Sequence, residues 1–316
     1  MTQELKSKRR EPVARVRKAV MMSLGFLCVM PTVAGAQQRM PPPPPPSAEL
    51  AAVRAEQAAE PEYKSSDAHF ATLKAKARSS GKIGWAELPD WSGVWESLWV
   101  DRIDGVKTSV DYTPMPLTEA AKKKYDPFYE HVKDGSASDP ITACLPAGFP
   151  RTLTVPFYTE FLLTPGRSVQ FTEIQSEARR IYTDGRGHVP EDRAYPLWSG
   201  DSIGFWDGDK LVVHSNHLRE YSSGFYRFGP PMSDQATVVE EIRRVSQNEI
   251  LDKVTIYDPV NLTRPYRTVQ GWRLVTTPDA RVDTWSCEEN SSAAINPDGS
   301  TKLVLPTEVS ADSKRN

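Results

Sequence analysis

The feature that most constrains the fold of this chain is a succession of short β-type runs in its second half. From residue 152 onward, runs of five to ten residues alternate with turns that contain Gly, Pro, Asn or Asp. Residues of these types permit tight reversals, and no helical pattern of crossover length separates most of the runs. The predicted strands are 155–163, 168–175, 178–183, 202–206, 210–218, 237–245, 250–257, 267–276 and 281–287.

These short connections indicate an antiparallel sheet, because parallel neighbours need a crossover of a dozen or more residues. Sequential strands without an internal repeat predict a mainly β domain. We expect either an antiparallel up-and-down, lipocalin-like barrel or a strongly curved sheet, with a helical N-terminal arm. A two-sheet sandwich is the alternative. Three tryptophans spaced four apart, Trp91, Trp95 and Trp99, share one face of a further predicted strand.

The first 36 residues have the three parts of a secretory signal peptide. Seven basic side chains precede an apolar run at 19–30, and Ala34-Gly35-Ala36 provides a small-x-small cleavage site. This run is shorter than the roughly 20 residues needed to span a bilayer. We therefore predict a periplasmic or secreted protein with no membrane span after signal cleavage. An uncleaved N-terminal anchor is the alternative.

The composition divides the chain into four parts. These are a signal peptide at 1–36, a Pro-rich linker and helical arm at 37–84, a β-barrel domain at 85–306 and a flexible tail at 307–316. The linker contains six consecutive prolines, which hold a polyproline II rod. Helices are predicted at 48–60, 67–79 and 118–133.

Without the signal peptide the chain is acidic. Seven of its 39 basic and two of its 41 acidic side chains lie in residues 1–36, so 32 basic and 39 acidic side chains remain, a net charge of −7. This excess disfavours broad electrostatic attraction to nucleic acid or to anionic lipid. We therefore expect no nucleic-acid partner.

Two cysteines remain after signal cleavage, Cys144 and Cys287. In an oxidising compartment, two is the number that pairs without remainder. We predict a disulfide between them, which would close a long loop and stabilise the fold by at most roughly 4–5 kcal/mol. Two buried free thiols are the alternative.

Sorting the predicted strands with a period of two gives each of them two rows of side chains. In 250–257 the row that starts at Ile250 and Asp252 is core-like, whereas the row from Leu251 to Tyr257 is predicted to be partly wet. Several rows mix aromatic with hydrogen-bonding side chains. A barrel that encloses a small ligand needs such walls, and an ordinary partly exposed sheet has the same pattern.

The densest group of chemically useful side chains lies at 179–188 (RRIYTDGRGH). Tyr and His can transfer protons, Asp can orient them and Arg can hold an anion. The predicted catalytic residues are His214 as the base, Tyr182 and His188 as acid or orienting groups, and Asp184. The predicted substrate-binding residues are Arg180, Arg186, Trp95, Trp206 and Trp272. A hairpin end laced with surface ion pairs is the alternative interpretation.

Other motifs carry less weight. Residues 200–204 (GDSIG) match the nucleophile-elbow pattern, but no helix follows the serine. His214 and His217 would face opposite sides of a strand, and Asp207 and Asp209 are typical turn residues. The chain has no Gly-rich phosphate loop, no Cys-x-x-Cys and no dinucleotide fingerprint. We therefore predict neither a metal nor a cofactor.

Several motifs, taken together, are similar to those of a family of exported bacterial proteins of unassigned function. The similarity covers roughly residues 89–290. It depends on Cys144-x-Pro146-x-Gly148-x-Pro150-Arg151, on 179–188 and 200–213, on Asp258-Pro259 with Thr263-Arg264-Pro265, and on Cys287-x-Glu289-Asn290. The resemblance implies export and a β-rich fold but no particular activity. Two positions depart from the family's pattern, because His214 replaces an acidic residue and Val189 interrupts a His-Pro pair.

The sequence supports three hypotheses for the function. The first is an exported barrel enzyme that acts on an apolar or aromatic small molecule by cofactor-independent acid–base chemistry. A lyase or isomerase is favoured over a hydrolase, because no nucleophile is convincing. The second is a non-catalytic, lipocalin-like binding or carrier protein for an apolar small molecule. The third is an envelope-interaction protein that uses the polyproline arm. The sequence leaves the substrate and the oligomeric state open.

Overall fold

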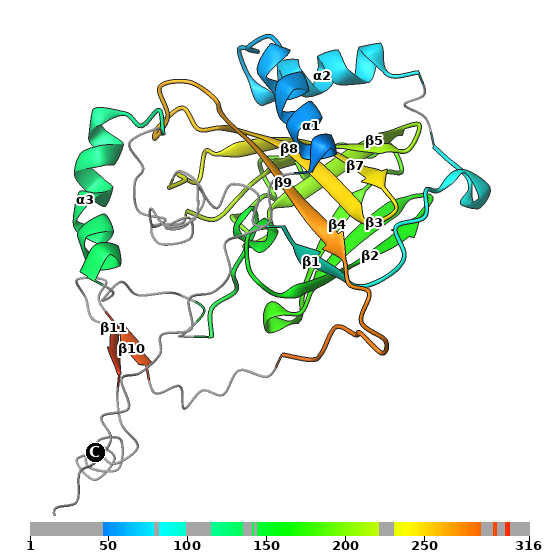
Figure 1. The fold of residues 1–316 in the computed structure, drawn as a ribbon. Helices are drawn as coiled ribbons and strands as arrows, with labels where there is room; N and C mark the ends of the chain where they lie inside the picture. The colour runs from blue at the N-terminus through cyan, green and yellow to red at the C-terminus, as the bar shows by residue number, and fades with distance from the viewer. Residues whose placement is uncertain are drawn as a thin grey trace, which may run out of the picture. The chain divides into compact units, whose positions relative to one another are not determined.

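Nine strands close into a barrel in the computed structural model of the chain, which describes residues 47–78, 82–98, 115–134, 141, 144–220, 231–285, 293–295 and 301–303. The strands follow one another around the barrel in chain order, and Figure 1 labels most of them. They are β1 (Trp95–Ser97), β2 (Tyr158–Thr164), β3 (Arg167–Thr172), β4 (Glu177–Tyr182), β5 (Asp201–Asp207), β6 (Lys210–Asn216), β7 (Thr237–Ser246), β8 (Glu249–Tyr257) and β9 (Tyr266–Leu274). The predicted mainly β barrel is confirmed. The predicted signal peptide and polyproline rod lie outside the described residues.

One pair of neighbouring strands in the barrel is parallel. β4 and β5 run in the same direction, with Ile181 opposite Ser202 and Tyr182 opposite Ile203, whereas the other neighbouring pairs are antiparallel. A closed ring of nine strands requires such a pair, because alternating directions close only around an even number of strands. The sequence predicted antiparallel pairing, and the difference arises at the connection 183–200, which brings the chain back beside the end of β4 before β5 begins.

The helices lie close to their predicted positions. They are α1 (Ala48–Ala59), α2 (Ser66–Lys76) and α3 (Glu119–Asp134). No helix in the described ranges is long and apolar enough to cross a membrane. The strand predicted at 281–287 is wrong for 281–285, and β1 closes the barrel against β9 instead. A hairpin of β10 (Ala293–Ile295) and β11 (Thr301–Leu303) was not predicted.

The barrel interior contains the main hydrophobic core. The rings of Phe161 on β2 and Trp272 on β9 have centroids 5.1 Å apart, and the Trp91 ring lies 5.4 Å from both Phe161 and Trp206 of β5. β2, β5 and β9 are not neighbours in the sheet, so these contacts cross the interior. Side chains in the same rows as these residues therefore point inward, and the alternate rows face outward.

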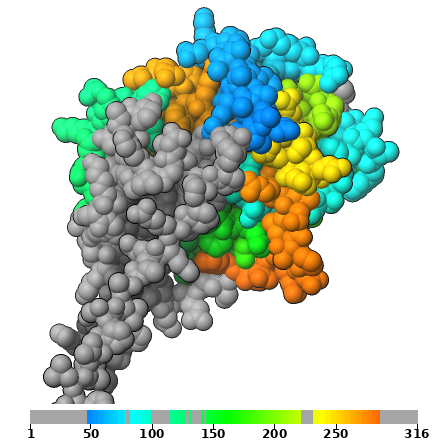
Figure 2. All heavy atoms as spheres, viewed as in Figure 1, coloured from blue at the N-terminus to red at the C-terminus, as the bar shows by residue number. Residues whose placement is uncertain are grey.

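The helices α1 and α2, which we call the helical strap, pack on the outside of the barrel against β6 to β9 (Figure 1). Leu50 and Val53 of α1 form a buried cluster with Leu251 and Val269. Gln57 donates hydrogen bonds to two strand carbonyls, at 3.1 and 3.2 Å. The atoms of α1, blue in Figure 2, lie against the yellow and orange atoms of the strands.

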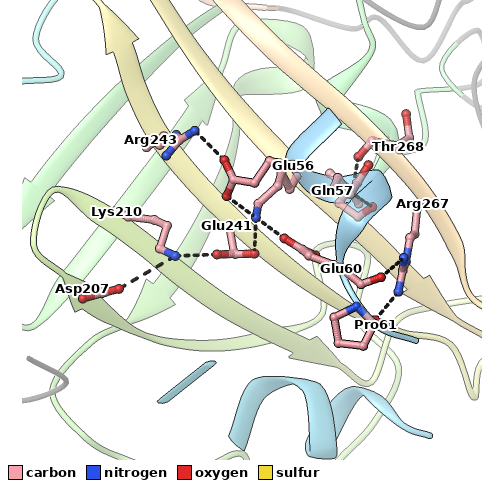
Figure 3. A network of polar contacts seen from close by, with 12 residues as sticks. Glu56, Gln57, Glu60, Pro61, Asp207, Lys210, Glu241, Arg243, Arg267 and Thr268 are labelled. Carbon is pink, nitrogen blue, oxygen red and sulfur yellow. Dashed lines mark hydrogen bonds and ion pairs between the residues drawn. The ribbon is translucent and has the colours of Figure 1, made fainter. Parts of the chain in front are cut away.

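Ion pairs hold the strap to the same wall. The ammonium of Lys253 contacts carboxylates of Glu56 at 2.9 Å, of Glu241 at 2.7 Å, and of Glu60. Burial by itself would lower the pKa of Lys253, but these carboxylates outweigh it and raise that pKa. The surrounding charges are shown in Figure 3, where Glu56, Glu60 and Glu241 lie among Lys210, Arg243 and Arg267.

The strap changes the environment of the outer strand rows. The row from Leu251 to Tyr257 was predicted to be partly wet, but all nine residues of β8 are buried. The inner row is covered by the core and the outer row by α1 and α2. The sequence predicted these helices as an arm and did not show that they pack on the barrel.

We expect Leu50→Ala to destabilise the protein by about 2–4 kcal/mol, because it leaves a cavity between the strap and the wall. Leu50 is 2% exposed. The matched control is Leu162→Ala on the outer row of β2, where the side chain is 55% exposed and the loss should stay below about 1 kcal/mol. Urea unfolding monitored by tryptophan fluorescence measures both losses. Equal losses would show that packing of the strap on the barrel does not stabilise the fold.

Candidate functional site

The inward-facing side chains of the barrel form two layers. The turns β5–β6 and β7–β8 lie at one end of the barrel, which we call the mouth. Most inward positions nearer the mouth are apolar, namely Ile181, Trp206, Leu211, Ile242, Ile250 and Trp272. Deeper inward positions on the same strands include Arg179, Ser202, Ser215, Glu240, Asp252 and Gln270, with Gly204 and Val213 between the two sets on β5 and β6. A mainly apolar layer therefore lies between the mouth and a polar layer.

A buried ion pair lies at the centre of the polar layer. The Arg179 guanidinium donates to both carboxylate oxygens of Glu240, one of them at 2.8 Å. It also donates to the hydroxyls of Ser202 at 3.3 Å and Ser215 at 2.9 Å. The side chains of Arg179 and Glu240 are 3% and 0% exposed. The two charges cancel, and the guanidinium is held by hydrogen bonds from three directions.

Asp252 adds a second carboxyl group to this layer and is fully buried. Burial, together with the negative charge of Glu240, raises the pKa of Asp252 well above its usual range. The neutral acid is therefore favoured, and such a group can donate a hydrogen bond as well as accept one.

Several polar atoms of the interior have no hydrogen-bond partner among the described residues. They are the indole N–H groups of Trp91, Trp206 and Trp272, both amide atoms of Gln170, the hydroxyl of Ser168 and the carboxyl oxygens of Asp252. Asp252 can still share its own proton with Glu240. Buried polar groups in native proteins are nearly always hydrogen-bonded. Apart from Asp252, these atoms therefore need partners beyond the described residues, such as water or a ligand.

A depression of about 560 Å³ lies at the mouth. Trp91 lines it and also belongs to the barrel core, so this buried side chain lies between the depression and the interior. Arg244 and Leu274 line it as well.

The segment 147–155 covers the opposite end of the barrel and is buried throughout. The Phe149 ring lies 3.5 Å from the Arg179 guanidinium carbon, and Ser97 donates to the Leu153 carbonyl at 3.1 Å. The Gly148 N–H donates to the Glu177 carboxylate at 3.1 Å, and burial raises the pKa of Glu177. This segment therefore closes the end of the barrel opposite the mouth.

The barrel wall separates the predicted site residues into two groups. Trp95, Trp206 and Trp272 point into the interior, as expected of walls for a ligand. His214 and Tyr182 lie on the outer rows of β6 and β4. The predicted catalytic and wall residues therefore do not share one pocket.

The predicted site residues on the outside of the barrel form two separate clusters. Asp184 and Arg186 form an exposed ion pair at 2.6 Å, and Arg186 stacks on the Tyr182 ring at 4.1 Å. Arg180 is exposed on the outer row, whereas its neighbour Arg179 faces inward. Residues 180–186 therefore match the alternative interpretation of this segment, a hairpin end with surface ion pairs.

His188 and His214 are brought together in a hydrogen-bonded chain. The Nε2 atom of His188 lies 2.7 Å from Nδ1 of His214, and the Nδ1 atom of His188 lies 2.8 Å from the Asp201 carboxylate. On the other side, His214 Nε2 is 2.9 Å from the Ser66 hydroxyl of α2. Burial, and then the nearby His188, lower the pKa of His214 to about 4, so His214 is neutral at pH 7.

Glu60, His69 and Glu241 place one ligand atom each within 4.8 Å of one another, a spacing that a metal ion could use. The ammonium of Lys253 already binds both carboxylates, and Lys210 contacts Glu241 as well. A divalent cation would have to enter among these positive charges. The donor set therefore suits the lysine and not a metal.

The sequence did not predict several residues of the barrel interior and of the hydrogen-bonded chain on the outer wall. Arg179 could have been found, because adjacent arginines on a strand face opposite sides and a buried arginine requires a carboxylate. No local pattern links Ser66 with His214, which is 148 residues away. Cys144 is disulfide-bonded. Its pairing with Cys287 stays a prediction, because Cys287 lies outside the described residues.

Neither a protein-family model nor a curated protein matches this chain. The resemblance to a family of exported bacterial proteins therefore stays a prediction.

We expect Arg179→Met to destabilise the protein by about 3–5 kcal/mol, because it leaves Glu240 buried without its counter-charge. Arg180→Met is the matched control and should cost less than about 0.5 kcal/mol, since that side chain is exposed. Urea unfolding at pH 7 measures both. Similar losses for the two arginines would contradict the buried ion pair.

The contribution of His214 to stability should fall as the pH drops from about 6.5 towards 4. Within this window the unfolded chain binds a proton on residue 214 that the folded protein does not, since the folded pKa is about 4. His69, whose pKa burial also lowers to about 4, contributes in the same direction. His214→Asn should reduce the slope of the unfolding free energy against pH by up to about 1.4 kcal/mol per pH unit.

The control for this slope is Thr237→Val, which removes a hydroxyl that donates to Ser66 and leaves both imidazoles in place. It should lower stability without changing the slope. Urea unfolding at several pH values measures both, and a wild-type slope in His214→Asn would contradict the prediction.

Proposed function

We propose that this protein binds a small amphipathic molecule inside the barrel. Its aromatic or apolar body would lie among the tryptophans near the mouth, and a hydrogen-bonding group would reach the polar layer. The observation that carries the proposal is the set of buried, unpartnered polar atoms, above all both amide atoms of Gln170. Barrels of about this strand number hold one small ligand in lipocalins.

The charge of the interior supports an uncharged ligand. Arg179 and Glu240 neutralise each other, and the neutral acid is favoured at Asp252. A charged ligand would have no opposite charge left to pair with in this layer, and burying an unpaired charge is costly.

Binding is favoured over acid–base catalysis in the interior. The five histidines of the chain lie outside the barrel interior, on α2, α3, the outer row of β6 or connections. The interior groups that could transfer a proton are carboxyls, and Glu240 is already engaged by Arg179. We therefore retain the carrier hypothesis for the interior and not the lyase or isomerase that used His214.

Export is part of the same proposal. It is supported by the signal-like residues 1–36 and by a disulfide at Cys144, a bond typical of oxidising compartments. A periplasmic or secreted carrier would meet its ligand there.

We expect 2-naphthol to bind the purified protein about tenfold more tightly than naphthalene, because one added hydrogen bond to a buried unpaired group is worth roughly 1–1.5 kcal/mol. Gln170→Leu should remove most of this preference while retaining naphthalene binding. Isothermal titration calorimetry at pH 7 measures the four affinities.

The matched control is Gln235→Leu, at an exposed position just before β7 and at the end of that strand away from the mouth, which should keep the wild-type affinities for both compounds. The proposal fails if neither compound shows saturable binding, or if Gln170→Leu and Gln235→Leu behave alike.

A further inference from the structure

The hydrogen-bonded chain on the outer wall has one direction of proton donation. Thr237 Oγ1 donates to Ser66 Oγ at 2.8 Å, so the proton of Ser66 itself is left for His214 Nε2. The other nitrogen of His214 then donates to His188 Nε2, and His188 Nδ1–H donates to the Asp201 carboxylate. The Ser66 hydroxyl thus faces His214 as its proton acceptor. His188 contacts the other side of His214, and the Asp201 carboxylate in turn accepts from His188.

We infer that Ser66 is the nucleophile of a hydrolase site for short-chain carboxylic esters, with His214 as its general base and His188 and Asp201 as positioning residues. This site lies on the outer wall and does not depend on a ligand in the barrel. It supplies the nucleophile that the sequence did not reveal.

The positions of the groups match what nucleophilic catalysis requires. Nucleophile and base lie 2.9 Å apart, and the base contacts the next residue of the chain at 2.7 Å. Such a serine is activated by a neighbouring base that a third group orients. His214 is 3% exposed, and its neutral state at pH 7 leaves Nε2 free to take a proton.

The first chemical step can be written with a full balance. The Ser66 oxygen attacks the ester carbonyl carbon, and the Ser66 proton passes to His214 Nε2. The tetrahedral intermediate then expels the alcohol oxygen, which takes that proton and leaves as the alcohol. Water attacks the acyl-Ser66 ester by the same route, which releases the carboxylic acid and restores the serine.

The start of α2 can stabilise the oxyanion. Ser66 and Asp67 are the first two residues of the helix, so their N–H groups have no acceptor within it. The next two N–H groups are bonded to Ser65, at 3.2 and 3.0 Å. Developing negative charge on the carbonyl oxygen is favoured at such a terminus.

Burial sets the size of the substrate. Ser66 is 4% exposed, and its Oγ also accepts a hydrogen bond from the half-buried Thr237. Asp67 beside it is exposed, so the site lies just below the surface. Because Ser66 is almost completely buried, we expect a short acyl group to reach it more easily than a long one.

The test is covalent labelling of the full chain with a fluorophosphonate, followed by peptide mapping. We expect one phosphonylated residue, Ser66, in the folded wild-type protein. His214→Asn should slow the labelling at least 100-fold, the size of effect that loss of a general base produces. Ser65→Asn is the matched control, because it removes the adjacent hydroxyl, keeps a helix-capping side chain and should label at the wild-type rate.

Hydrolysis of p-nitrophenyl acetate provides a second readout. It should exceed that of p-nitrophenyl octanoate and should be lost in Ser66→Ala. His188→Gln should slow labelling and shift its pH profile, which a merely structural residue would not do. The inference is overturned if wild-type Ser66 stays unlabelled, if the label lies on another residue, or if Ser66→Ala retains hydrolysis. Mapping of the wild-type chain decides this even if a variant fails to fold.

Discussion

A ring of nine strands cannot alternate in direction all the way round, and much of this molecule follows from where the one parallel pair falls. It falls between β4 and β5, so residues 183–200 must carry the chain back beside β4 instead of turning tightly. That connection places His188 over the outer wall, next to Asp201 at the start of β5 and His214 on β6. The connection at the parallel pair thus places His188 beside His214 on the outer wall.

The wall itself then separates two kinds of chemistry. Inside, nine strands surround an apolar layer and a polar layer whose Arg179–Glu240 pair is neutral as a whole. Outside, the helical strap covers β6 to β9 and brings Ser66 to His214. Because successive residues of a strand face opposite sides, β6 contributes Ser215 to the interior and His214 to the strap.

The sequence predicted much of the fold for a simple reason. Strand periodicity and turn residues are local signals, and they located the strands from β2 to β9 within a few residues. The candidate site was harder, since Trp206 and His214 both looked like pocket residues. Their opposite orientations depend on which row faces inward, and Arg179 and Arg180 likewise looked equivalent until one of them proved to be buried against Glu240.

The sequence by itself determined a β-rich domain with aromatic and polar side chains in alternating rows, together with two helices ahead of it. The tertiary structure alone decided that β1 closes the barrel, that the helices pack on the outer wall, and that Ser66 meets His214. The physical reason is the range of the interactions. Turns and alternation act between residues a few positions apart, whereas barrel closure, strap packing and the Ser66–His214 hydrogen bond join residues that the chain separates by more than a hundred positions.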